Sequence, residues 1–192
     1  MNLLLINADQ LRHDCVGYRG LRNVKTPALD RFAAESVVYN RAFTPLPVCA
    51  PARQSILCGR HPDSFGAQWN YDFMPTPTVQ PEWSWVRQLE ERGWNTAYLG
   101  RFHVSPTLKP CDFGYQDWIS WAGHKQILKE KYPDAQYTGG WLGCESPVAL
   151  EDSGTHWMAD RAAEMIKKYA AEDKPWHIWV DYEEPHLPCR PS

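Results

Sequence analysis

The sequence lacks the features that mark membrane proteins and nucleic-acid-binding proteins. It has no hydrophobic run long enough to span a bilayer. Residues 1–9 contain an apolar run, but it is too short for a signal peptide and lacks both a basic start and a cleavage site. The 20 Lys and Arg residues are spread along the chain, and the formal net charge is −3. We therefore expect neither a membrane nor a nucleic acid as a partner.

The cysteines also lack a recognisable pattern. There are six, and they form no Cys-x-x-Cys pair and no regular spacing, so the sequence predicts neither a zinc site nor a disulfide framework. We expect reduced thiols and hence a cytoplasmic location. What the chain does contain is 43% hydrophobic residues, with ten tryptophans among 192 residues. That composition is typical of one globular domain or part of one.

Strand and helix patterns alternate along the chain. Residues 3–8 form a continuous apolar run, as expected for a strand that is covered on both faces in a parallel sheet. The other predicted strands are residues 37–43, 96–99 and 176–182. The predicted helices are residues 26–35 with Leu29, Phe32 and Ala33 on the inner face, a helix beginning near Cys49, residues 81–92 ended by Gly93, and a helix from Ser153 or Thr155 to about Ala171.

This alternation predicts an α/β fold with a doubly wound sheet, in which functional groups follow the carboxyl ends of the strands. Residues 104–150 are rich in loop-forming residues and are predicted to be an insertion. Within that insertion, Trp118, Trp121 and Trp141 are candidates for stacking on a sugar or aryl ring, with burial as the ordinary alternative.

Residues 49–53, Cys-Ala-Pro-Ala-Arg, are predicted to join a loop to a helix. Residues 44–48 cannot be helical, because each proline favours an extended residue before it, whereas Pro51 has the φ of a first helical turn. Cys49 would then lie at the positive end of a helix, where free N–H groups favour an anion. This placement suits a nucleophile. The ordinary alternative is that Cys49 is a small buried side chain and Arg53 a solvated one.

Residues 49–59 resemble the signature of the sulfatases, Cys-x-Pro-Ser/Ala-Arg followed by a short apolar segment and Gly, in which the cysteine is oxidised to formylglycine. Residues 7–14 resemble the opening of bacterial sulfatases and phosphonate monoester hydrolases. There the aspartate that matches Asp9 binds a divalent metal, although Asp9 taken singly would be an ordinary turn residue. Many members have a second aspartate where this chain has Gln10, whose carbonyl oxygen can also approach a hard cation.

Two further segments resemble the same family. Residues 93–103 are similar to Gly-Tyr-x-Thr followed by Gly-Lys-x-His, whose lysine and histidine reach the formylglycine and the transferred group. His103 matches the histidine, but Arg101 replaces the lysine, and its forked guanidinium is a larger cation. Residues 185–188 match Pro-His-x-Pro, which assigns His186 to the sulfate pocket. Taken singly, these histidines would be a packed strand end and part of a surface turn.

The resemblance covers nearly the whole chain. It implies a formylglycine-dependent sulfatase of the alkaline phosphatase superfamily, with a three-layer α/β/α sandwich and a mostly parallel sheet. A hydrated aldehyde at position 49 would attack the sulfur of a sulfate ester of a small molecule or carbohydrate. By resemblance, Arg53 would hold the formylglycine, while Arg101, His103 and His186 would contact substrate oxygens or transfer protons.

The resemblance also implies a metal and a maturation partner. Asp9, Gln10 and residue 49 would bind a divalent ion, for which Ca²⁺ is the family's usual choice and Mg²⁺ or Mn²⁺ are alternatives. Conversion of Cys49 would require a formylglycine-generating enzyme, here in a bacterial cytoplasm.

The family pattern is incomplete in one respect. Sulfatases supply an Asp-Asn or Asp-His metal pair from a later segment, and nothing after Cys49 matches it, because Asp181 has the wrong sequence context. We therefore expect residues 1–192 to be the N-terminal portion of a sulfatase domain. Three hypotheses remain: a sulfate ester hydrolase completed by the rest of the domain, a phosphonate monoester or phosphodiester hydrolase, and a non-catalytic fragment. Exposed sheet edges would favour association with the rest of the domain or with a second copy.

Overall fold

The computed structural model describes residues 1–20 and 23–191. Its strands and α-helices, in chain order, are β1 (Leu3–Ala8), α1 (Pro27–Ala34), α2 (Cys49–Cys58), α3 (Trp85–Glu91), β2 (Asn95–Gly100), β3 (Asp117–Ile119), α4 (Ala122–Lys131), α5 (Gly154–Ala170) and β4 (Trp176–Tyr182). Short 3-10 turns lie between several of them. Among the described residues, no helix has the length and hydropathy needed to cross a membrane.

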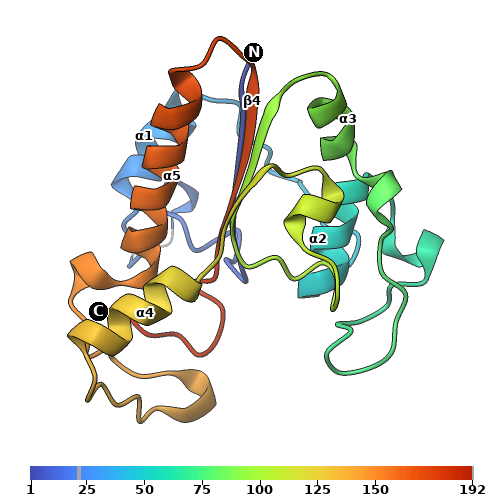
Figure 1. Cartoon of the computed structure of the whole chain (residues 1–192). Helices are drawn as coiled ribbons and strands as arrows, with labels where there is room; N and C mark the ends of the chain where they lie inside the picture. Colours follow the sequence, from blue (N-terminus) through green and yellow to red (C-terminus); the bar gives the residue numbers. More distant parts are fainter. Residues whose placement is uncertain (21–22, 192) are drawn as a thin grey trace.

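Four parallel strands form one sheet in the order β1-β4-β2-β3. The sheet lies between α5 on one side and α2 and α3 on the other (Figure 1). Near the carboxyl ends of three strands, Asn7, Asp181 and Gly100 share one row of the register. Because parallel strands end at the same edge, the segments that follow β1, β2 and β4 come together there. The α/β class and the three-layer arrangement are as predicted.

Two cores cover the two faces of the sheet. The core on the α5 side includes Ala97, Leu99, Ile178 and Val180 from the strands, with Met158, Ala162, Met165 and Tyr169 from the helix. The core on the other side includes Tyr98 and Trp179 from the strands, with Leu57 of α2 and Val86 of α3. Neighbouring residues of β2 and β4 therefore face opposite layers, as the two-residue period of a strand requires.

Two of the helices that cover the sheet, α5 and α3, begin at serine caps. Ser153 accepts a hydrogen bond from the N–H of His156 at the start of α5, and the predicted helix with its buried stripe is confirmed. Ser84 plays the same role for α3, accepting from the N–H of Val86 while its hydroxyl donates to the carbonyl of Phe113. The helix predicted for residues 81–92 is therefore divided at Ser84 into a 3-10 turn and α3.

Two predictions about the first fifty residues are wrong. Residues 37–43 form no strand, and Val37, Tyr39 and Phe43 are 79%, 78% and 88% exposed. The inner face predicted for α1 is also uncovered, since Leu29 and Phe32 are 46% and 71% exposed. An apolar pattern identifies a surface that favours burial, but it does not say whether another element is there to cover it.

Residues 104–150, predicted to be an insertion, contribute to the sheet as well as to loops. Within this segment β3 pairs with β2 through residues 117–119, and α4 follows directly. Phe113 and Tyr115 are buried in the core that also contains Trp179. The segment therefore supplies part of a core layer in addition to its connecting turns.

Candidate active site

Three predicted site residues meet at the carboxyl edge of the sheet. Asp9 follows β1, Cys49 is the first residue of α2, and His186 lies in the loop after β4. One ligand atom of each side chain, a carboxylate oxygen, Sγ and a ring nitrogen, lies within 4.8 Å of the others. Asp9 is buried and the other two are partly buried. Residues separated by up to 177 positions in the chain are thus gathered into one cluster.

The local backbone explains how Cys49 comes to face this cluster. Val48 is extended at φ −130°, and α2 begins at the next residue, as predicted from the proline pattern. The side chain of Val48 cannot cap the helix, but Asn70 does so from a distant loop, since its Oδ1 accepts the N–H of Ala50 at 2.8 Å. The Sγ of Cys49 lies 3.9 Å from Oδ1 of Asp9, to which it donates.

Arg53 occupies the buried floor of the site. It lies one turn after Cys49, and its side chain is only 3% exposed. Its Nε and one terminal nitrogen each donate to Asp181 at 2.9 Å, and the same terminal nitrogen lies 3.3 Å from Oδ2 of Asp9. A paired, bidentate arrangement of this kind is the one in which a buried guanidinium is stable.

The charges of this pair are fixed by their surroundings. Burial raises the pKa of Asp181, and the Arg53 guanidinium opposes that rise together with hydrogen bonds from Asn7 and Tyr98 at 2.8 and 2.7 Å. Burial lowers the pKa of Arg53, but the Asp181 carboxylate and other neighbouring groups outweigh burial. The pKa of Arg53 is therefore raised overall. Burial and the adjacent Asp181 also raise the pKa of the Tyr98 phenol, so that Tyr98 remains a donor.

The sequence context of Asp181 does not match a metal pair, and in the structure this residue binds Arg53. Its carboxylate is fully buried beside Arg53, in the row of the sheet that also contains Asn7 and Gly100. The signal that could have identified it is positional. An aspartate at the end of a predicted central strand lies next to the end of β1, whatever residues follow it.

Arg101 and His103 follow β2 at the same edge. The side chain of Arg101 is 30% exposed, and its guanidinium lies 3.7 Å from Glu183 in the loop after β4. His103 is buried, and its Nε2 lies 2.5 Å from Oδ2 of Asp72, a residue with no sequence signal. Burial lowers the pKa of His103 and Arg101 lowers it further, while Asp72 opposes both effects.

Position 100, just before Arg101 and His103, requires a glycine. Gly100 has φ +115°, a conformation that side chains disfavour, and a Cβ there would lie 2.0 Å from the backbone oxygen of Asp181. The chain can therefore turn out of β2 in direct contact with β4. This close approach sets the positions of Arg101 and His103.

Gln10 and His186 each form a hydrogen bond with the backbone of Leu187. Gln10 has a left-handed φ of 64°, and its Oε1 accepts the N–H of Leu187 at 3.2 Å. The Nδ1 of His186 donates to the carbonyl of Leu187 at 2.6 Å, because a carbonyl oxygen can only accept. In the neutral imidazole, Nε2 is therefore the basic nitrogen of His186.

Comparisons with known proteins give the family and the fold that this chain resembles. A family model described as Sulfatase matches residues 1–191. The chain is 31% identical to an ulvan-active sulfatase of Formosa agariphila and 28% identical to human iduronate 2-sulfatase, covering 97% and 99% of this chain. It spans 36% of the length of each of these two relatives. The structure of a phosphonate monoester hydrolase of Agrobacterium radiobacter matches with a TM-score of 0.75 at 20% identity, over 100% of this chain and 42% of that one.

Proposed function

This chain belongs to the sulfatase family, and we propose that it carries the nucleophile of an enzyme that hydrolyses sulfate esters. The observation that carries this proposal is the cluster of Cys49 with Asp9 and His186, in which ligand atoms lie within 4.8 Å of one another. Carbohydrate sulfates are the substrates that the names of the two sulfatase relatives favour. The chain accounts for only part of the relatives' length. The proposal therefore concerns the whole protein that contains this segment.

Conversion of Cys49 to formylglycine would replace the thiol with an aldehyde. When hydrated, residue 49 supplies one hydroxyl that attacks sulfur and a second whose loss of a proton expels sulfate and restores the aldehyde. The position of residue 49 at the start of α2 supports this chemistry, because the positive end of the helix dipole stabilises developing negative charge. The ion pairs of Arg53 with Asp9 and Asp181 fix the buried side chains next to residue 49.

Other side chains of the site have separate tasks in this proposal. His186 has its Nδ1 committed to the carbonyl of Leu187, so its Nε2 is the atom that takes the proton from the hydroxyl at residue 49. Arg101 lies 3.7 Å from the exposed carboxylate of Glu183, and the remaining N–H groups of its guanidinium can bind sulfate oxygens. His103, oriented by Asp72, takes part in the proton transfers of the site.

The oxygen donors at this edge fit a hard divalent cation as part of its coordination. Asp9 offers a carboxylate, Gln10 an amide oxygen, and residue 49 an oxygen after conversion. Ca²⁺ takes about 6–8 oxygen ligands, so these residues would hold the ion together with further donors. The ion would neutralise charge on the ester oxygens. Asp181 is committed to Arg53 and is not among the donors that we assign.

The mass of the tryptic peptide 42–53 tests the proposal. The chain is produced beside a formylglycine-generating enzyme, and we expect an aldehyde in place of the thiol at Cys49. The adjacent peptide 54–60 contains Cys58, on the same helix, and provides an internal control that stays a thiol. An intact thiol at Cys49 under these conditions would contradict the proposal.

Paired assays of the converted protein then separate the alternatives. An aryl sulfate and an aryl phosphonate monoester are offered to the same preparation, with Cys49→Ala as the blank. Preference for the phosphonate would favour the second hypothesis, which the shared fold with the Agrobacterium enzyme supports. An aldehyde without hydrolysis of either ester would limit the proposal to maturation of residue 49.

A further inference from the structure

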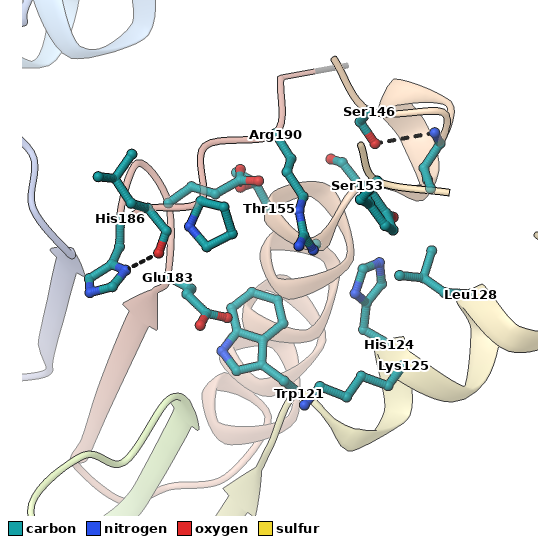
Figure 2. Close-up of a pocket in the computed structure, with 16 residues that line it drawn as sticks. Trp121, His124, Lys125, Leu128, Ser146, Ser153, Thr155, Glu183, His186 and Arg190 are labelled. Carbon is teal, nitrogen blue, oxygen red and sulfur yellow. Dashed lines mark hydrogen bonds between the residues drawn. The ribbon is translucent and has the colours of Figure 1, made fainter. Parts of the chain in front are cut away.

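A separate cavity of about 260 Å³ opens beside the nucleophile cluster. It lies between α4, the first turn of α5 and the loop that follows β4. In Figure 2, His186 lies on one side of the cavity and His124 on the opposite side, with Trp121 between them. Because His186 belongs to both the cavity and the cluster with Cys49, a molecule in the cavity would reach the reacting centre.

The size and the wall of the cavity fit one ring-shaped group. Pockets for drug-sized ligands measure about 300–1,000 Å³, and this one lies just below that range. Trp121, Leu128 and Pro188 give it an apolar surface on which the face of a sugar ring can lie. Gly154 keeps the cavity open, since a Cβ there would lie 3.1 Å from Cζ3 of Trp121.

His124 gives the cavity a directed polar group. The residue is 8% exposed, and its Nε2 lies 2.8 Å from the carbonyl oxygen of Asp152. A carbonyl only accepts, so Nε2 carries the hydrogen and Nδ1 of the neutral ring is an acceptor. The Nδ1 edge of the ring faces Gly154, which also lines the cavity. An acceptor at that position suits the hydroxyl group of a sugar.

The cavity is lined by two carboxylates and by the cations Lys125 and Arg190. Its two carboxylates are engaged: Glu183 lies 3.7 Å from Arg101, and Glu184 accepts the hydroxyl of Thr155. By contrast, Lys125 and Arg190 have no carboxylate within ion-pair distance among residues 1–20 and 23–191. The guanidinium of Arg190 is held 4.1 Å from the ring centre of Tyr137 by a cation–π contact, which leaves its N–H groups as donors.

From these features we infer that the cavity binds the sugar of the substrate, and that this sugar carries a second anionic group besides the sulfate that is cleaved. Trp121 contacts the ring, His124 accepts a hydroxyl, and Lys125 and Arg190 bind the second anion. That anion is a ring carboxylate or another sulfate, which share the same oxygen-donor chemistry. The inference rests on the proposed function, because it assigns the cavity to the same substrate.

Binding to the unconverted chain tests the inference without turnover. Calorimetry compares three probes: a hexose monosulfate with no second anionic group, a uronic acid monosulfate and a hexose disulfate. We expect the second or third probe to bind about tenfold more tightly than the first, because a charge-assisted contact is gained. Equal affinity for all three, or no binding of any, would overturn the inference. The probe that is preferred identifies the second anion as a carboxylate or a sulfate.

Substitutions assign the preference to the cavity. Lys125→Gln and Arg190→Gln should each remove most of the roughly tenfold preference for the doubly charged probe over the hexose monosulfate. Lys129→Gln is the matched control, since Lys129 lies on α4 but does not line the cavity. Equal weakening of all probes by the cavity variants would contradict the assignment, because it would indicate general damage or nonspecific attraction.

The two proposals fail in different ways. A chain that gains the aldehyde and hydrolyses singly and doubly charged sugar sulfates equally well would retain the proposed function and overturn the cavity assignment. A chain that keeps its thiol but still prefers the doubly charged probe, and loses this preference in Lys125→Gln, would support the cavity and contradict the proposed catalysis.

Discussion

The Arg53 guanidinium lies between two carboxylates, and its removal would leave both of them buried without a counter-charge. We expect Arg53→Met to lower the free energy of unfolding by about 3–5 kcal/mol, the usual cost of breaking a buried pair from one side. Urea denaturation measures this value, and Arg92→Met, at the exposed end of α3, provides the control.

A double substitution separates the ion pair from general packing. Arg53→Met combined with Asp181→Leu removes both charges, so the combined loss should be smaller than the sum of the two single losses. Strictly additive losses would contradict the electrostatic account. In that case the Arg53 side chain would contribute chiefly through the apolar contacts of its stem.

At the residue scale, the sequence predicted the members of the site that occur in short motifs. Cys49, Asp9 and His186 are in this group, and the structure brings them together. Asp72 and Asp181 belong to no motif, because their relation to the site exists only after the loop containing Asp72 and strand β4 are in place. Which residues meet at the end of a strand depends on the fold, and the neighbouring residues in the sequence do not show it.

The start of α2 depends on a contact from outside the helix. Asn70 accepts the N–H of Ala50, where the helix has no cap of its own. We expect Asn70→Ala to lower the free energy of unfolding by about 1 kcal/mol, as for other lost caps. Hydrogen exchange at the Ala50 amide should also accelerate, because its acceptor is removed. Asn40→Ala, in an exposed turn, is the control, and equal effects of the two variants would contradict the capping role.

At the element scale, strands and helices with strong local signals were predictable. Strands β1 and β4 have continuous apolar runs, and α5 has a clear 3.6-residue stripe with a serine cap. The failure at residues 37–43 has a physical cause, since apolar residues there find no neighbouring strand in the described structure. The short strand β3 was missed because three residues cannot display a period.

Exposed apolar residues lie on β1 and on α1. β1 is an outer strand of the sheet, and its Leu3, Leu4 and Ile6 are 40%, 40% and 61% exposed. Phe32 of α1 adds a large aromatic at 71% exposure. A parallel strand with these residues is ordinarily covered on both faces. We propose that further residues of a sulfatase domain or a second copy cover this surface.

The stability of the whole molecule should fall in acid because of His177. This residue of β4 is fully buried between Trp85 and Tyr115, and burial lowers its pKa from 6.5 to about 4. Above about pH 6.5 the ring is neutral in both states, and the full stability is present. As the pH falls towards 4, His177 is protonated in the unfolded chain but stays neutral in the folded chain. The free energy of unfolding therefore decreases.

Each pKa unit corresponds to about 1.36 kcal/mol. His177 alone should therefore lower the free energy of unfolding by about 2 kcal/mol between about pH 7 and about pH 4.5. Urea denaturation at these two values measures the loss, and His177→Phe keeps a ring in the core while removing the titration. The variant should lose about 2 kcal/mol less than the wild type over that interval, whereas His13→Phe, at an exposed position, should behave like the wild type. An identical loss in the wild type and in His177→Phe would mean that other groups carry the acid sensitivity of the fold.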